Sequence, residues 1–197
     1  MNIDLSERKA IVCGSTQGMG RAAAEELATL GATVTLVARN EDSLKTVRDA
    51  LIGVDHQAIC ADFGETDILE KRVNSHVERD GPFHILVNNT GGPPPGEIAD
   101  AESEEFLDAL SKHLLCNQIM TKAVLPGMKA EGYGRIINII STSVKQPIVN
   151  LGVSNTTRGA VASWAKTLSR EVASFGITVN NILPGTTTVS YTHLRAH

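Results

Sequence analysis

Four short segments of the sequence carry residue types that could bind a ligand or act on it. They are the glycine run 14–20, the polar segments 88–91 and 141–143, and the pair Pro184-Gly185. Each lies at the end of a short apolar run that predicts a β-strand. Ligands of open parallel sheets bind beyond the carboxyl ends of the strands, so the four segments can meet in one site.

The first segment could hold a pyrophosphate group, and it reads Gly14-Ser15-Thr16-Gln17-Gly18-Met19-Gly20. Glycine has no Cβ, so backbone N–H groups can approach phosphate oxygens closely. A helix that begins after the run directs its positive end at the same anion. The spacing is G-x-x-x-G-x-G rather than G-x-G-x-x-G. Taken alone, such a glycine run is as typical of an ordinary turn as of a phosphate-binding loop. Between a strand and a helix it indicates a dinucleotide-binding site.

Arg39 follows the second predicted strand, at the position that distinguishes the two nicotinamide dinucleotides. An acidic side chain would accept hydrogen bonds from the ribose 2′-hydroxyl, whereas an arginine suits a 2′-phosphate. The sequence therefore favours NADP(H) over NAD(H), the alternative being a solvated arginine at the start of a loop. After the third predicted strand, Asp62 and Phe63 could hold the adenine edge or form an Asx turn.

The elements that must position these residues alternate regularly along the chain. Nearly continuous apolar runs predict strands at 9–13, 33–38, 56–61, 84–88, 135–140 and 177–183. Helical periodicity lies between them at 18–30, 41–51, 66–80, 103–129 (with a bend near Pro126) and 153–175. Strands of this kind are buried on both faces, which predicts an α/β fold with a doubly wound, Rossmann-like parallel sheet.

Composition excludes several other classes of protein. The 197 residues are 42% hydrophobic and 20% charged with a formal net charge of −4, which argues against a disordered chain. No apolar run is long enough to cross a bilayer, and no basic patch suggests nucleic acid as a partner. The three widely spaced cysteines form no metal-ligand or disulfide pattern, and the N-terminus carries no signal segment. We expect a cytoplasmic protein that binds no metal, no membrane and no nucleic acid.

In their order and spacing, the four segments resemble those of the short-chain dehydrogenases/reductases. The stretches 122–128 (KAVLPGM) and 169–180 (SREVASFGITVN) are similar to the 3-oxoacyl-carrier-protein reductase branch of that family. The resemblance covers residues 5–185 and implies a small carbonyl or acyl-thioester substrate, with copies of the chain paired through the two long helices. The residues expected at the cofactor are Gly14, Ser15, Thr16, Gln17, Gly18, Met19, Gly20, Arg39, Asp62, Phe63, Asn89, Gly91, Arg158, Pro184 and Gly185.

The catalytic residues that the resemblance implies are only partly present. The family uses a serine, a tyrosine thirteen residues later, a lysine four residues after that, and an asparagine in the preceding long helix. Counted from Ser141, Ser154 stands at the tyrosine position and Arg158 at the lysine position. His113 stands at the asparagine position, and Thr90 replaces the family's usual alanine. A serine hydroxyl is a far weaker acid than a phenol, and losing a positioned acid costs about 10²–10⁴-fold in rate.

These replacements leave two functions open, beside the possibility that the chain is a truncated fragment with no function. The first is an NADP(H)-dependent reductase of a 3-oxoacyl-thioester-like carbonyl that works with an altered acid. The second is a non-catalytic dinucleotide-binding protein, a sensor or a partner subunit. Arg158 could bond the nicotinamide ribose and keep a positive charge there. His113 either serves as the acid near neutral pH or only fills the space of the asparagine, and Asn117 could recover part of the asparagine's role.

The end of the chain departs from the pattern of the family. There the sheet continues after Pro184-Gly185 with a substrate-covering helical segment and one further strand, and neither is found in this sequence. Residues 189–197 (VSYTHLRAH) look like one translated frame of a transposon-end adapter. We therefore expect one dinucleotide-binding domain over 1–188, truncated at its C-terminus and followed by a non-native tail over 189–197. The sixth strand would then be an exposed edge.

Overall fold

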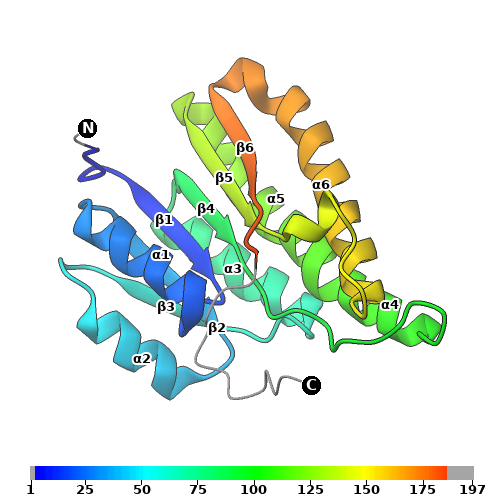
Figure 1. Ribbon diagram of the computed structural model, residues 1–197. Helices are drawn as coiled ribbons and strands as arrows, with labels where there is room; N and C mark the ends of the chain where they lie inside the picture. Colours follow the sequence, from blue (N-terminus) through cyan, green and yellow to red (C-terminus); the bar gives the residue numbers. More distant parts are fainter. Residues whose placement is uncertain (1–2, 186–197) are drawn as a thin grey trace.

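Six strands form one parallel sheet in the computed structural model, which describes residues 3–185 (Figure 1). The strands are β1 (Lys9–Cys13), β2 (Thr33–Ala38), β3 (Gln57–Cys60), β4 (Ile85–Asn88), β5 (Gly134–Ile139) and β6 (Ile177–Ile182). Their order is β3-β2-β1-β4-β5-β6, and every neighbouring pair is parallel. The predicted doubly wound fold is confirmed, with strand ends that differ from the predicted ones by no more than one residue.

Helices cover both faces of this sheet and give the molecule two hydrophobic cores. The helices are α1 (Gly18–Thr29), α2 (Glu41–Ala50), α3 (Thr66–Asp80), α4 (Ser103–Leu110), α5 (Cys116–Glu131) and α6 (Gly152–Val172). Successive strand residues point to opposite faces. Ile11 and Leu86 accordingly pack with residues of α3, α5 and α6, whereas Val12 and Val87 pack with residues of α1 and α2. Burial on both faces explains why the strands read as continuous apolar runs.

The long helix predicted over 103–129 is interrupted by one π-helical turn. This turn, η1 (Ser111–Leu115), joins α4 to α5. Pro126 lies inside α5, which continues through it to Glu131, so the departure from α-helical hydrogen bonding lies at η1 rather than at the proline. Single π turns inside α-helices occur frequently at functional sites. This one carries His113, one of the residues singled out from the sequence.

The two edge strands of the described sheet are β3 and β6. Along β6, Thr178, Asn180 and Ile182 are exposed, as expected for an edge strand. The predicted tail 189–197 lies outside the described residues. No helix within residues 3–185 combines the length and apolar character that a membrane span requires.

Candidate functional site

The carboxyl ends of β1, β4, β5 and β6 carry the four segments that the sequence singles out, and hydrogen bonds join these segments in pairs. The Asn89 side-chain amide donates to the carbonyl oxygens of Cys13 at 3.3 Å and Gly14 at 3.2 Å. The backbone N–H of Thr142 donates to the carbonyl of Pro184 at 3.1 Å. The segment after β4 thus lies against the glycine run, and the segment after β6 lies against the one after β5.

The glycine run forms a turn that is too tight for larger residues. Gly14 and Gly18 have positive φ angles of 57° and 52°, in the left-handed region that favours glycine. A Cβ on Gly20 would lie 2.2 Å from the carbonyl oxygen of Gly14, and a Cβ on Gly14 would lie 2.5 Å from that of Asn89. Both contacts involve backbone atoms, so the turn could admit a side chain only by moving.

The helix after this turn offers its N-terminus to solvent. α1 begins at Gly18, and both Gly18 and Met19 are exposed. The first N–H groups of a helix have no partner inside the helix, and they carry its partial positive charge. No acidic side chain stands in the first turn of α1 to repel an anion. This end of the helix therefore has the properties of a phosphate-binding site.

Arg39 lies beside the glycine turn with a free guanidinium. It follows β2, and its side chain is exposed, without an ion pair or hydrogen bond among residues 3–185. The Ser15 hydroxyl donates to the Val37 carbonyl at 3.4 Å, which ties the glycine turn to the end of β2 close to Arg39. A cation next to a phosphate-binding helix end suits a second phosphate group.

Three residues expected at the cofactor are used by the fold itself. Ser15 is fully buried, so its hydroxyl serves the bond to Val37. Asp62 accepts the N–H of Gly64 at 2.8 Å, which is the Asx turn of the alternative interpretation. Phe63 packs against the core between the sheet and α5. Their side chains stabilise the loops, whereas Gln17, Gly91 and Gly185 are exposed beside the site.

Arg158 places a buried positive charge at the centre of the other half of the site. Only 9% of the residue is exposed, and it reaches from α6 to donate one hydrogen bond, at 3.1 Å, to the carbonyl of Ile139 at the end of β5. Its other terminal nitrogen lies 3.7 Å from where a Cβ on Gly92 would be. No carboxylate pairs with it among the described residues. Burial lowers the pKa of Arg158 to about 10, so the side chain stays cationic at neutral pH.

His113 faces this charge from the π-helical turn. It is 2% exposed, and its Nδ1 lies 2.5 Å from the hydroxyl oxygen of Thr90. Burial, together with the charge of Arg158, lowers the pKa of His113 to about 3. The imidazole is therefore neutral at pH 7. Whether His113 acts as the acid or only fills the space of the family's asparagine stays a prediction.

Sequence reasoning recorded Thr90 only as a replacement and missed its bond to His113. A sequence signal for this contact existed, because Thr90 and His113 both differ from the residues that the resemblance leads one to expect at their positions.

The remaining polar candidates are the hydroxyls of Ser141 and Ser154 and the amide of Asn117, and none is an acid as strong as a tyrosine. Ser141 accepts the N–H of Ser143 at 3.0 Å at the start of the short helix η2 (Thr142–Val144), which leaves its hydroxyl proton available. Ser154 lies half-buried one turn before Arg158 on α6, and its hydroxyl has no hydrogen-bond partner in the described part of the chain. Asn117 is buried in α5.

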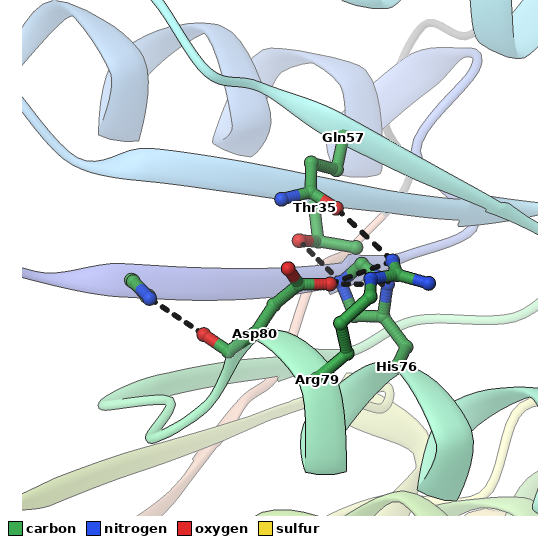
Figure 2. A network of polar contacts seen from close by, with 6 residues as sticks. Thr35, Gln57, His76, Arg79 and Asp80 are labelled. Carbon is green, nitrogen blue, oxygen red and sulfur yellow. Dashed lines mark hydrogen bonds and ion pairs between the residues drawn. The ribbon is translucent and has the colours of Figure 1, made fainter.

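A second polar cluster lies toward the amino ends of the strands, opposite the site, and has a structural role. Figure 2 shows His76 between Thr35 and the Arg79–Asp80 ion pair, with its Nε2 3.2 Å from the Thr35 hydroxyl. Lys9, at the start of β1, donates to the Asp80 carbonyl at 2.5 Å. These contacts fasten the end of α3 to the amino ends of the strands. Within residues 3–185 no three His, Cys, Asp or Glu side chains are grouped to hold a metal ion.

Comparison with known proteins agrees with this geometry. The family model described as short chain dehydrogenase matches residues 8–196. The chain is 32% identical to 3-oxoacyl-(acyl-carrier-protein) reductase of Vibrio harveyi over 185 residues, which are 93% of the chain and 75% of that protein. Its structure superposes on a variant of actinorhodin polyketide ketoreductase, solved with NADPH, with a TM-score of 0.84 and 36% identity, covering 93% of the chain and 72% of that one.

A third relative bears on whether the site is catalytic. The chain is 31% identical over 182 residues to "Inactive hydroxysteroid dehydrogenase-like protein 1" of Homo sapiens, and the match covers 90% of the chain and 55% of that protein. The chain is thus similar both to proteins named as reductases and to one named as inactive.

Proposed function

The chain belongs to the short chain dehydrogenase family, and from this membership and the site we propose that it is an NADP(H)-dependent reductase of a carbonyl group, with a 3-oxoacyl thioester or a similar compound as substrate. The observation that carries the proposal is the exposed first turn of α1 with the free guanidinium of Arg39 beside it. A cytoplasmic location and pairing of two copies through the long helices stay predictions.

The residues present fit a phosphorylated dinucleotide. The N–H groups of Gly18 and Met19 would hold the pyrophosphate, and Arg39 would hold the 2′-phosphate. Gly91 is exposed with no atom within 4 Å of its Cβ position, which leaves room for the nicotinamide ribose between it and Arg158. When bound, the cofactor supplies the hydride that reduces the carbonyl carbon.

The substrate carbonyl would lie among Ser141, Ser154 and Arg158. The two hydroxyls can donate hydrogen bonds to the carbonyl oxygen, and Arg158 sets a positive potential around it. The Vibrio harveyi relative and the ketoreductase with NADPH are named for the reduction of oxoacyl or keto groups, which supports this substrate class. Because no tyrosine stands at position 154, we expect turnover about 10²–10⁴-fold below that of a tyrosine-bearing relative.

A second candidate is a protein that binds the dinucleotide without catalysis. It is favoured by the serine and arginine at the positions of the family's tyrosine and lysine, and by the name of the inactive human relative. Both candidate functions use the same cofactor site, so only a measurement of hydride transfer distinguishes them.

A fluorescence titration with NADPH, followed by addition of a short β-keto thioester, tests both candidates. Binding followed by oxidation of NADPH supports the reductase. Binding without oxidation for this thioester and for a panel of simple ketones supports the non-catalytic protein, and absence of binding contradicts both.

The preference for a cofactor with a 2′-phosphate is tested by substituting Arg39. Arg39→Ala should weaken NADPH binding about 10–100-fold, since a hydrogen bond to a charged group contributes roughly 1.5–3 kcal/mol. NADH affinity should not change. Arg170→Ala, which removes an exposed arginine of α6, is the matched control. Equal losses for both cofactors would contradict the assignment of Arg39 to a 2′-phosphate.

A further inference from the structure

Arg158 differs from the other charged side chains whose contacts are described. The ion pairs that Arg and Lys side chains make within residues 3–185 join largely exposed or partly exposed groups, such as Arg21 with Glu25 and Lys112 with Asp108, whereas the buried Arg158 has none. A guanidinium has five N–H donors, and within the described part of the chain this one makes a single hydrogen bond, to the carbonyl of Ile139. Most of its donors are therefore available to a ligand.

Burial of an unpaired charge is costly unless hydrogen bonds or a counter-charge offset it. Among residues 3–185 no carboxylate pairs with Arg158. The groups found near it include the Ile139 carbonyl, the backbone at Gly92 and the imidazole of His113, which is neutral at pH 7. Neutral ribose hydroxyls could accept hydrogen bonds but would leave the charge uncompensated. The arrangement is suited to a negative charge that arrives with the ligand or forms during the reaction.

We propose that Arg158 binds the negative oxygen that develops on the reacting carbonyl, so that this chain stabilises an alkoxide where its relatives protonate it with a tyrosine. The catalytic part of the proposal rests on the proposed function. A hydride adds to the carbonyl carbon, and the π electron pair of the C=O bond moves to the oxygen, which Arg158 and the Ser154 hydroxyl hold. A proton from water then converts the alkoxide to the alcohol and leaves hydroxide.

The net proton comes from water because no group of the site can give one up without taking it back. A guanidinium keeps its proton and acts as a hydrogen-bond donor. His113 is neutral, and any proton that the Ser154 hydroxyl passes to the alkoxide has to be returned to it by water. Donors that are fixed in a buried site stabilise a developing charge without having to reorient, which is the principle of an oxyanion hole.

Anion binding to the apo-protein provides a test that needs no turnover. Acetate carries a delocalised negative oxygen of suitable size, and its binding is measured by the rise in Tm at constant ionic strength. We expect wild type and Arg170→Met to be stabilised by acetate, Arg158→Lys less so, and Arg158→Met not at all. Equal stabilisation of wild type and Arg158→Met would overturn the proposal that this site binds oxyanions.

Turnover of a neutral β-keto thioester then tests the alkoxide. Arg158→Met should lower kcat about 10²–10³-fold with little change in KM, the cost of losing one oxyanion-hole donor, and Arg158→Lys should recover part of the loss. If the negative oxygen belongs instead to a substrate carboxylate, the loss appears in KM and only with a keto acid such as acetoacetate, which would overturn the alkoxide assignment. An unchanged kcat combined with weaker NADPH binding would reduce Arg158 to a ribose contact.

Failure of this proposal is distinguishable from failure of the proposed function. If wild type binds no NADPH and reduces no carbonyl, the proposed function fails and the alkoxide assignment falls with it, while the acetate measurement still decides whether Arg158 is an anion site. If wild type reduces the thioester and Arg158→Met does so equally well, only the proposal for Arg158 fails.

Discussion

The two halves of the site keep the family's pattern to different degrees. Around β1, α1 and β2, the tight glycine turn, the exposed helix end and the cation at Arg39 are all present. Around β4, η1, β5 and α6, only Ser141 matches the four catalytic residues that the resemblance implies, and the other three positions hold different residues. The first half works largely through backbone groups that the fold itself positions. The second works through side chains, which can change without altering the fold.

The replacements in the second half fit one another. Thr90 is bonded to His113, and His113 is neutral beside the charge of Arg158. A protonated imidazole in that place would repel the guanidinium, and an alanine at position 90 would leave Nδ1 without this partner. Thr90 and the charge of Arg158 therefore both favour a neutral imidazole at position 113. The half around β1, α1 and β2 is called the unchanged half here, and the half around β4, η1, β5 and α6 the changed half.

The largest expected effect comes from restoring the family's residues in the changed half. In the double variant Ser154→Tyr/Arg158→Lys, kcat for a β-keto thioester should rise about 10²–10⁴-fold, because a phenol next to a cation is a much better proton donor than a serine. The rate is followed by the absorbance of NADPH. Thr156→Tyr, on the exposed face of the same helix, controls for the added ring. A double variant slower than wild type would mean that the present residues form a working set of their own.

How much of this comparison the sequence predicts depends on the kind of contact. The strands and their carboxyl ends are predictable, because a short, nearly continuous apolar run between helices is typical of a parallel strand that is buried on both faces. The neutral state of His113 is not, since it depends on burial by distant parts of the chain and on Arg158, 45 positions further along. The π-helical turn is also hidden, because it shifts a few hydrogen bonds without changing the apolar pattern of 103–129. Ser15 illustrates the same limit, because a polar residue in a glycine run gives no sign that it is buried.

In the unchanged half, one added methyl group should disrupt the glycine turn. In Gly20→Ala the new Cβ would lie 2.2 Å from the Gly14 carbonyl oxygen and 2.6 Å from the Asn89 amide nitrogen, so the turn must open. Overpacking of this kind costs about 1–3 kcal/mol, and NADPH binding should weaken as the helix end moves. Urea unfolding and the fluorescence titration measure the two effects.

Gly159→Ala is the matched control for that variant, because no atom lies within 4 Å of its Cβ position in α6. There the same substitution should raise stability by about 0.5–1 kcal/mol. Equal effects at the two glycines would contradict the assignment of Gly20 to a turn that has no space.

The two halves should also differ in how an arginine substitution changes the free energy of unfolding. Replacing a buried, unpaired charge with an apolar side chain of similar length should be neutral or raise the free energy of unfolding by up to about 4 kcal/mol. We therefore expect Arg158→Met to unfold at higher urea concentration than wild type, while Arg39→Ala, at an exposed arginine of the unchanged half, should leave the midpoint nearly unaltered. A clear loss of stability in Arg158→Met would mean that the arginine serves the fold, and the argument for a ligand charge would lose its basis.

The last prediction is a pH dependence of stability that belongs to the changed half. The pKa of His113 is about 3 in the folded protein, against 6.5 for an unperturbed histidine. As the pH falls below 6.5, the unfolded chain binds a proton that the folded chain refuses, so stability falls by at most about 1.4 kcal/mol per pH unit until the folded pKa is reached. His113→Asn lacks this titration, and its free energy of unfolding should depend less steeply on pH over the same range. His76 and His84, whose pKa values are also lowered by burial, titrate in both proteins, so the difference between the two curves isolates His113. Parallel curves would show that folding does not lower the pKa of His113, which would contradict its burial as a neutral imidazole beside Arg158.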